Sequence, residues 1–173
     1  MNPDQSSAEK VVPFTTRTEL IENAINQYAK MIFALAVHQT GSRADADDIF
    51  QEVCLTLVRD QNAPLTNDSH LKSYLIRVTI NKCKDLHKSA WRKHTEPLEE
   101  HIDDISPESE SILDEVMRLK PFYRSVIYLY YYQGYSVKEI ADILDKKENT
   151  VSSALRRARV KLKTILEEEG YHG

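Results

Sequence analysis

The strongest chemical signal in the sequence is a run of amide, hydroxyl and basic side chains that starts at Asn149. Amides and hydroxyls can hydrogen-bond to the base edges of nucleic acids, and arginine and lysine can hold phosphates. The apolar residues between them recur at helical spacing, so the polar set is expected on one outward face of a helix. The residues predicted to contact duplex DNA are Asn149, Thr150, Ser152, Ser153, Arg156, Arg157, Arg159 and Lys161, with Lys163 as a further phosphate contact.

The stretch before this helix supplies a second helix and a tight break. Ser136 followed by Glu139 is a capping-box pattern, and Ala141 is small enough for two crossing helices to approach closely. We expect helices over 137–144 and 150–168 with DKKEN between them, the layout of a helix-turn-helix whose second helix enters the major groove. Asp145 occupies the turn position where glycine is usual, and aspartate tolerates left-handed backbone. A merely solvated basic helix end is the competing interpretation.

A second set of polar side chains lies in the stretch DADDIFQEV. Asp45, Asp48 and Glu52 share one helix face, with Asp47 and Gln51 beside them. Grouped carboxylates can bind a metal, but a di-metal site in a helical bundle would need two Glu-x-x-His motifs, and that spacing occurs only at Glu169–His172. We therefore predict no metal site and no cofactor, and interpret the face as an acidic surface that docks on a basic protein.

A third set follows in the stretch LKSYLIRVTINKCKDLHKSAWRK. Basic side chains recur there at roughly helical spacing among amides and aromatic rings, a mixture that suits a strand with exposed bases. Ordinary amphipathic helices often look the same, so this helix alone does not separate the two interpretations. The residues predicted to face nucleic acid here are Tyr74, Arg77, Asn81, Lys84, Asp85, Lys88 and Arg92.

The charge of the chain is unevenly distributed. The net charge is −4, yet nine acidic residues and no lysine or arginine lie between Glu96 and Glu115. The rest of the chain is therefore net basic, and the distribution of charge, rather than its total, governs attraction to phosphates. Pro97 and Pro107 interrupt the acidic strip, which we interpret as a link between two halves.

Helical periodicity is the main pattern along the chain, and only 4 Gly and 6 Pro interrupt it. We predict an all-α fold of two small helical domains joined by an acidic linker, the C-terminal domain being a helix-turn-helix. The expected parts are a flexible N-terminus (1–16), a first domain (17–93), the linker (94–111) and a second domain (112–169). Further helices are expected near 20–41, 42–60, 71–92, 112–119 and 122–133.

The sequence also argues against several classes of protein. The longest apolar run, Met31–Val37, is too short to span a bilayer, and the start lacks a signal-peptide pattern, so we predict a cytoplasmic protein without direct membrane insertion. Cys54 and Cys83 stand alone and are expected to be reduced, mostly buried thiols. No phosphate loop or nucleophile elbow is visible, so no enzyme is predicted. The tyrosines over 128–135 are expected to pack in the core.

Taken together, DADDIFQEV, LKSYLIRVTINKCKD and LKPFYRSVIYLYYYQGYSVKEIADILDKKENTVSSALRRARVKL resemble, in this order and spacing, the extracytoplasmic-function sigma factors of bacterial RNA polymerase. The resemblance covers the chain from about Leu20 to Leu166. Two positions depart from the family pattern: Cys54 stands where an aromatic residue is usual, and Asp145 replaces the turn glycine. Neither change removes a functional group.

The resemblance implies a role for each set of residues. The helix with Asp45, Asp48, Gln51 and Glu52 would bind the clamp helices of core RNA polymerase. The helix from Leu71 would face the melted −10 strand, and the loop 61–70 would cup a base flipped from it, at a cost of a few kcal/mol of unstacking. The helix-turn-helix would read the −35 duplex, and the acidic link would thread toward the polymerase active-site cleft.

The expected function is therefore a sigma factor that recognises −10 and −35 elements and directs transcription initiation, including promoter melting. Such factors are commonly held inactive by an anti-sigma protein, which is a possible further partner. One alternative is a free-standing helix-turn-helix regulator, a dimer on a palindromic site, but it leaves the acidic face without a role. Another is a sigma-like decoy that binds polymerase and never starts transcription.

Overall fold

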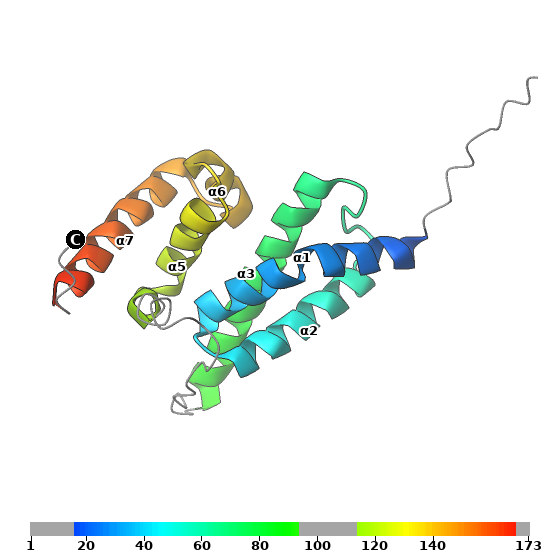
Figure 1. The fold of residues 1–173 in the computed structure, drawn as a ribbon, viewed down its shortest axis with the longest axis horizontal. Coiled ribbons are helices and arrows are strands. Elements are labelled where there is room, and N and C mark those ends of the chain that lie inside the picture. The colour runs from blue at the N-terminus through cyan, green and yellow to red at the C-terminus, as the bar shows by residue number, and fades with distance from the viewer. Residues whose placement is uncertain (1–15, 94–113, 169–173) are drawn as a thin grey trace, which may run out of the picture.

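The computed structural model describes residues 16–93 and 114–168, and every regular element in these ranges is helical (Figure 1). The predicted all-α class is confirmed. The predicted linker (94–111) and nearly all of the predicted flexible N-terminus (1–16) lie outside the described residues. The elements are α1 (Arg17–Thr40), α2 (Arg43–Arg59), α3 (Asp68–Lys93), α5 (Pro121–Ile127), η1 (Tyr128–Tyr132), α6 (Val137–Leu144) and α7 (Glu148–Glu168), and residues 114–117 are also helical.

Helix α1 begins and ends at strong sequence signals. Thr16 and Glu19 form a capping box at its start. Gly41 ends the helix in the left-handed conformation, at φ 71°. A β-carbon at Gly41 would also lie 2.7 Å from the ε-carbon of Met117, so a larger residue would require the end of that side chain to move. Ser42 then caps α2 through the backbone N–H of Asp45.

The N-terminal unit is a bundle of α1, α2 and α3. Its core holds one apolar stripe from each helix, including Ile32 of α1, Val53 and Leu57 of α2, and Leu75 of α3, all at most 1% exposed. Each helix is amphipathic, so burial of these stripes is what brings the three together. The polar faces of α2 and α3 are left on the outside of the bundle.

The C-terminal unit contains α5, η1, α6 and α7. The capping box of Ser136 and Glu139 opens α6 as predicted, and Asp145 closes it in the left-handed conformation at φ 52°. Ile140 and Ala141 face the second helix, where Val151 is fully buried. The short break and the crossing of α6 on α7 make this pair a helix-turn-helix (Figure 1).

Two boundaries differ from the sequence-based expectation. Helix α7 begins at Glu148, not Thr150, because Asp145 alone turns the chain and the carbonyl of Lys147 already accepts hydrogen bonds from the N–H groups of Thr150 and Val151. The helix expected over 122–133 is divided into α5 and the π-helical turn η1. Hydrophobic spacing does not reveal such a turn because the widening adds one residue without changing the composition.

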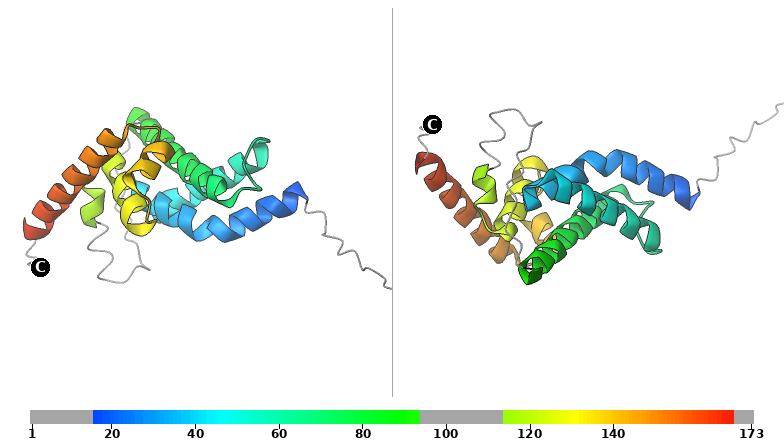
Figure 2. Two further views of the ribbon diagram at one scale, coloured as in Figure 1. Left: turned by 90° about the horizontal axis from the view of Figure 1, so that it is seen from above. Right: turned by 90° about the horizontal axis from the view of Figure 1, so that it is seen from below.

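The two units pack against each other: α1 lies against α5, and α3 lies against α6 (Figure 2). Leu35 of α1 and Ile76 and Ile80 of α3 belong to the same apolar cluster as the core of the C-terminal unit, and all three are at most 2% exposed. The sequence predicted two linked domains, and the structure adds that their described parts share a buried interface.

Among the described helices, none combines the length and apolar character that a membrane crossing requires.

Candidate nucleic-acid interface

The outward face of α7 carries most of the residues predicted to contact duplex DNA. Val151, Ala154 and Ala158 point into the core, so the intervening positions are forced outward. Asn149, Thr150, Ser152, Arg156, Arg157 and Lys161 are exposed, and Ser153 is half-buried. Arg156 and Arg157 carry no ion pair or hydrogen bond with any described residue, so both guanidinium groups are available to a ligand.

Arg159 lies differently from its neighbours. Its Nε donates to the Tyr131 hydroxyl at 2.7 Å, and its guanidinium carbon lies 5.2 Å from the ring centroid of Tyr130 and 5.5 Å from that of Tyr131. These contacts hold the side chain against η1. Arg159 therefore presents a cation in a fixed place, and its Nε is already occupied.

The face of α3 holds the second predicted set. Arg77, Asn81, Lys84, Asp85 and Lys88 are all exposed, and the side chain of Arg92 lies outside the described residues. Lys88 Nζ lies 3.9 Å from Asp85, an exposed pair that contributes little to stability. Apart from Arg77, this face of α3 is open to solvent.

Two members of the α3 set make contacts that their predicted role does not include. Arg77 Nε donates to the Ile143 carbonyl of α6 at 3.1 Å, so it joins the two units. The Tyr74 hydroxyl donates to the Asp60 carboxylate at 2.8 Å, and Tyr74 is only half-exposed. Burial and this hydrogen bond raise the pKa of Tyr74, so the hydroxyl stays a donor. Tyr74 thus holds Asp60, at the start of the loop between α2 and α3, through a hydrogen bond.

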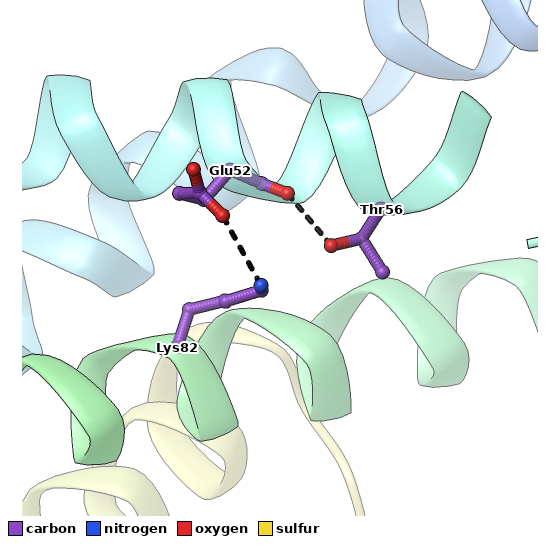
Figure 3. Close-up of polar contacts among 3 residues, drawn as sticks. All are labelled: Glu52, Thr56 and Lys82. Atoms are coloured by element: carbon purple, nitrogen blue, oxygen red, sulfur yellow. Dashed lines mark hydrogen bonds and ion pairs between the residues drawn. The ribbon is translucent and has the colours of Figure 1, made fainter. Parts of the chain in front are cut away.

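The acidic face of α2 has the predicted layout. Asp48, Gln51 and Glu52 are exposed, and Asp45, near the start of the helix, is half-buried. Glu52 forms an ion pair with Lys82 of α3, with 3.2 Å between Glu52 Oε2 and Lys82 Nζ (Figure 3). Its side chain is 52% exposed, so it remains accessible beside the pair.

The prediction of this face from sequence omitted two apolar residues of α2 and the partner of Glu52, Lys82 of α3. Leu55 is 43% and Val58 49% exposed, so α2 also presents two large apolar side chains at its surface. Leu55 follows Asp48 and Glu52 at helical steps, so the surface continues from acidic to apolar along α2. The periodicity of α2 contained this signal, whereas the pairing of Lys82 with Glu52 depends on how α3 packs.

The contact between the two units holds a cluster of buried polar groups. The ring of His38 lies 5.0 Å from that of Tyr128 and 5.1 Å from that of Tyr132. Burial, with the nearby charge of Arg124, lowers the pKa of His38 to about 4. His38 Nδ1, Gln39 Nε2 and Arg124 Nε have no hydrogen-bond partner among the described residues. The ring of His38 is therefore neutral while the units are in contact.

The tyrosine-rich segment divides into buried and exposed rings. Tyr128 is 3% exposed, as core packing predicts, but Tyr131 and Tyr132 are each 57% exposed, so the prediction is wrong for these two. Both of these exposed rings belong to the π-helical turn η1.

The described cysteines and acidic groups were the remaining candidates for metal binding or nucleophilic chemistry. Cys54 and Cys83 are both free, and burial raises the pKa of Cys83 to about 12, which makes it a poor nucleophile. No group of three or more His, Cys, Asp or Glu in the described residues is placed to hold a metal ion.

Comparison with known families matches both units. The model described as "Sigma-70 region 2" matches residues 24–93, and that described as "Sigma-70, region 4" matches residues 109–162. The ECF RNA polymerase sigma factor SigM of Mycobacterium tuberculosis is 28% identical over 150 residues, covering 84% of this chain and 76% of the relative. RNA polymerase sigma factor SigZ of Bacillus subtilis is 26% identical over 155 residues, covering 85% and 87%.

Two solved structures share the fold. The sigma factor RpoE of Bartonella quintana, solved with the anti-sigma factor NepR, superposes with a TM-score of 0.68 at 18% identity, covering 84% of this chain and 96% of that one. CnrH, solved with the cytosolic domain of CnrY, gives a TM-score of 0.62 at 20% identity, covering 87% and 89%. Each match spans both units.

Proposed function

The chain belongs to the extracytoplasmic-function sigma factors, which recognise promoters and start transcription, and we propose that its two units read separate promoter elements. The N-terminal unit (17–93) reads the −10 element and the C-terminal unit (112–169) reads the −35 element. One observation carries this division: two polar faces rich in basic residues, on α3 and α7, belong to different units, while an acidic and apolar face lies on α2. Its role is recognition rather than catalysis.

The −35 element is assigned to α7. Asn149, Thr150, Ser152, Ser153 and Arg156 lie toward the start of the helix, which is the part that reaches base edges in a helix-turn-helix. The second half of the exposed face, with Arg157, Arg159 and Lys161, holds phosphates. The position of Arg159 on the tyrosine rings favours a phosphate contact, because its Nε is already occupied.

The −10 element is assigned to α3 and the loop before it. Asn81, Lys84 and Lys88 form an exposed polar face that suits a single strand. A base leaving the duplex must regain a few kcal/mol of lost stacking, and the loop 61–70 is the adjacent place where a flipped base could be held. Promoter melting then follows from the capture of the unpaired strand.

Core RNA polymerase is assigned to α2. Charged groups steer and orient a partner, whereas buried apolar groups supply most of the affinity of a contact. The α2 face has both: Asp48, Gln51 and Glu52, followed by Leu55 and Val58. This combination supports a protein partner with a basic rim around an apolar site, as the clamp helices of the family's polymerase are expected to offer.

Two further roles rest on the family and on charge. The acidic linker (94–111) enters the polymerase cleft, where its charge imitates nucleic acid. An anti-sigma partner is proposed because both solved relatives were captured with other proteins, RpoE with the anti-sigma factor NepR and CnrH with CnrY. The protein acts where polymerase is found, in the cytoplasm.

Run-off transcription of fragmented genomic DNA tests the proposal. Core polymerase is used with and without the protein, and the new RNA ends are sequenced. New transcripts that share two boxes upstream are the expected result. Polymerase that binds the protein but stays silent would favour a decoy, and a protein that binds an operator as a dimer without polymerase would favour a free-standing regulator.

A further inference from the structure

The first residue of the loop between α2 and α3, Asp60, is held by hydrogen bonds. The Asp60 carboxylate accepts the Tyr74 hydroxyl at 2.8 Å and the backbone N–H of Asn62 at 2.9 Å. The guanidinium of Arg17 donates to the Asp60 carbonyl at 2.7 Å and to the Leu57 carbonyl at 3.4 Å. The entry to the loop is thus fixed to both α1 and α3.

The exit from the loop is tied down in the same way. Asp68, the first residue of α3, accepts hydrogen bonds at Oδ1 from the Tyr28 hydroxyl and from Gln27 Nε2, the latter at 2.9 Å. Both donors lie on α1. Each end of the loop therefore carries an aspartate held by a tyrosine from a neighbouring helix: Tyr74 of α3 holds Asp60, and Tyr28 of α1 holds Asp68.

The residues between these ends divide into an inner and an outer set. Ala63 is 9% exposed, and Leu65 packs on the core of the N-terminal unit. Short backbone hydrogen bonds cross the loop, including Leu65 N–H to the Ala63 carbonyl at 2.8 Å. Gln61, Asn62 and Thr66 are exposed, so the groups able to hydrogen-bond with a base point away from the packed side.

The two tyrosines remain donors over the physiological pH range. Burial, with the Asp68 hydrogen bond, raises the pKa of Tyr28 to about 12, and burial with the Asp60 hydrogen bond raises that of Tyr74. The Tyr74 hydrogen bond in turn lowers the pKa of Asp60. Hydrogen bonds to ionised acceptors are stronger than those between neutral groups. These pairs therefore persist under the conditions in which DNA is bound.

We propose that the Tyr74–Asp60 and Tyr28–Asp68 pairs are positioning groups that hold the loop in its base-binding shape before DNA arrives. Gln61, Asn62 and Thr66 then read the captured base. The inference rests on the proposed role of the loop in −10 recognition. A loop that is ordered in advance loses less conformational entropy on binding and so discriminates bases through fixed hydrogen bonds.

The test uses holoenzyme, made from the full chain and core polymerase, and a pool of single-stranded DNA with random sequence. Bound molecules are sequenced, and the preference for each base is measured at each position. Asp60→Ala and Tyr28→Phe are each expected to reduce the preference at one position by about fivefold, the effect of one lost hydrogen bond. Asp60→Asn retains an acceptor and should restore most of that preference.

Tyr132→Phe is the matched control, because it removes a hydroxyl from an exposed ring of the C-terminal unit. Core-polymerase affinity and binding to −35 duplex are measured for every variant. Unchanged base preference in Asp60→Ala and Tyr28→Phe would overturn the inference. So would equal losses of core affinity and −35 binding, because these indicate a folding defect. If the unaltered holoenzyme shows no base preference in single-stranded DNA, the proposed role of the loop is wrong and the inference falls with it.

Discussion

The two helices assigned to promoter DNA differ in how much of their surface is already used by the protein. On α7, Arg156 and Arg157 are exposed and have no polar partner in the described part of the chain. On α3, Arg77 is bonded to Ile143 of α6, and Lys72 Nζ lies 5.2 Å from the ring centroid of Tyr135. The C-terminal unit thus contacts α3 between Lys72 and Ile80, while the reading face of α7 stays open.

This difference separates the two recognition events. Helix α7 can meet duplex DNA without any change in the arrangement of the units. The Nε of Arg77 is bonded to the Ile143 carbonyl, so only its terminal NH2 groups are left to bind a phosphate, whereas all the guanidinium donors of Arg156 and Arg157 are open. Polymerase is the partner expected to hold the two units at the separation of two promoter boxes.

The largest expected effect comes from weakening the contact between α2 and polymerase. Asp48→Lys with Glu52→Lys reverses the exposed charges of α2, and we expect core-polymerase affinity to fall at least about 30-fold because like charges then meet at the contact. Equilibrium binding to labelled core enzyme measures this. Glu22→Lys with Glu168→Lys is the control, since both residues are exposed, lie outside α2 and change the net charge equally. Equal losses in the two double variants would contradict a specific role for the α2 face.

Two neighbouring arginines on the open face of α7 are expected to have different roles in binding DNA. Arg156→Ala is expected to relax preference at one −35 position by about 1–3 kcal/mol, the value of one base contact. Arg157→Ala is expected to weaken binding uniformly across sequences and to lower its salt dependence, as loss of a phosphate contact does. Holoenzyme binding to a set of −35 variants measures both. A uniform loss for Arg156→Ala would make it a second phosphate contact.

The contact between the two units depends on pH through His38 of α1. The pKa of its ring is about 4 in the packed state and 6.5 when it is exposed, so packing favours the neutral form. Stability from this contact is complete above pH 7 and is lost as the pH falls. The loss is about 2 kcal/mol at about pH 5. The facing groups are Arg124 on α5 and the rings of Tyr128 and Tyr132 on η1; the cation adds to the effect.

Thermal unfolding of the natural protein and of His38→Phe, each at about pH 7.5 and about pH 5, isolates this contribution from that of the carboxylates. The natural protein should lose more stability on acidification than His38→Phe, which keeps an aromatic ring between the tyrosines. The same loss in both proteins would show that His38 is not the group that responds.

The smallest expected effect distinguishes covered from open positions on α3 itself. Lys84 is exposed and has no ion pair or hydrogen bond in the described structure, whereas Arg77 Nε is held by the Ile143 carbonyl, which restricts the position of its guanidinium. Lys84→Ala should therefore weaken binding of single-stranded −10 DNA by holoenzyme more than Arg77→Ala does, by a few-fold for one phosphate contact. A larger effect for Arg77→Ala would mean that its bond to α6 does not compete with DNA.

Local signals in the sequence predicted most of the fold. Gly41 ends α1, Ser136 and Glu139 open α6, and Asp145 takes the left-handed conformation at the turn. Each of these depends on interactions within a few residues. The start of α7 was placed two residues late, because the capping role of the Lys147 backbone leaves no mark on residue type.

Features that depend on packing between distant segments could not be predicted. Leu35, Ile76 and Ile80 look like ordinary core residues of the first unit, and only the structure shows that they face the second. The Tyr74 side chain fits a stacking role by type, but Asp60, fourteen residues earlier in the chain, holds its hydroxyl. The predicted site residues on α2 and α7 are exposed as expected, apart from the half-buried Asp45 and Ser153, and their contacts with polymerase and DNA remain predictions.

Site-specific photo-crosslinking tests the division between the two reading helices most directly. A photoreactive amino acid replaces Asn81 on α3 or Ser152 on α7, both exposed, and the holoenzyme is irradiated on a promoter obtained from genomic run-off transcription. We predict crosslinks from position 81 to the non-template strand of the −10 element and from position 152 to the −35 duplex. Crosslinks from both positions to the same element, or from neither position to promoter DNA, would contradict the account.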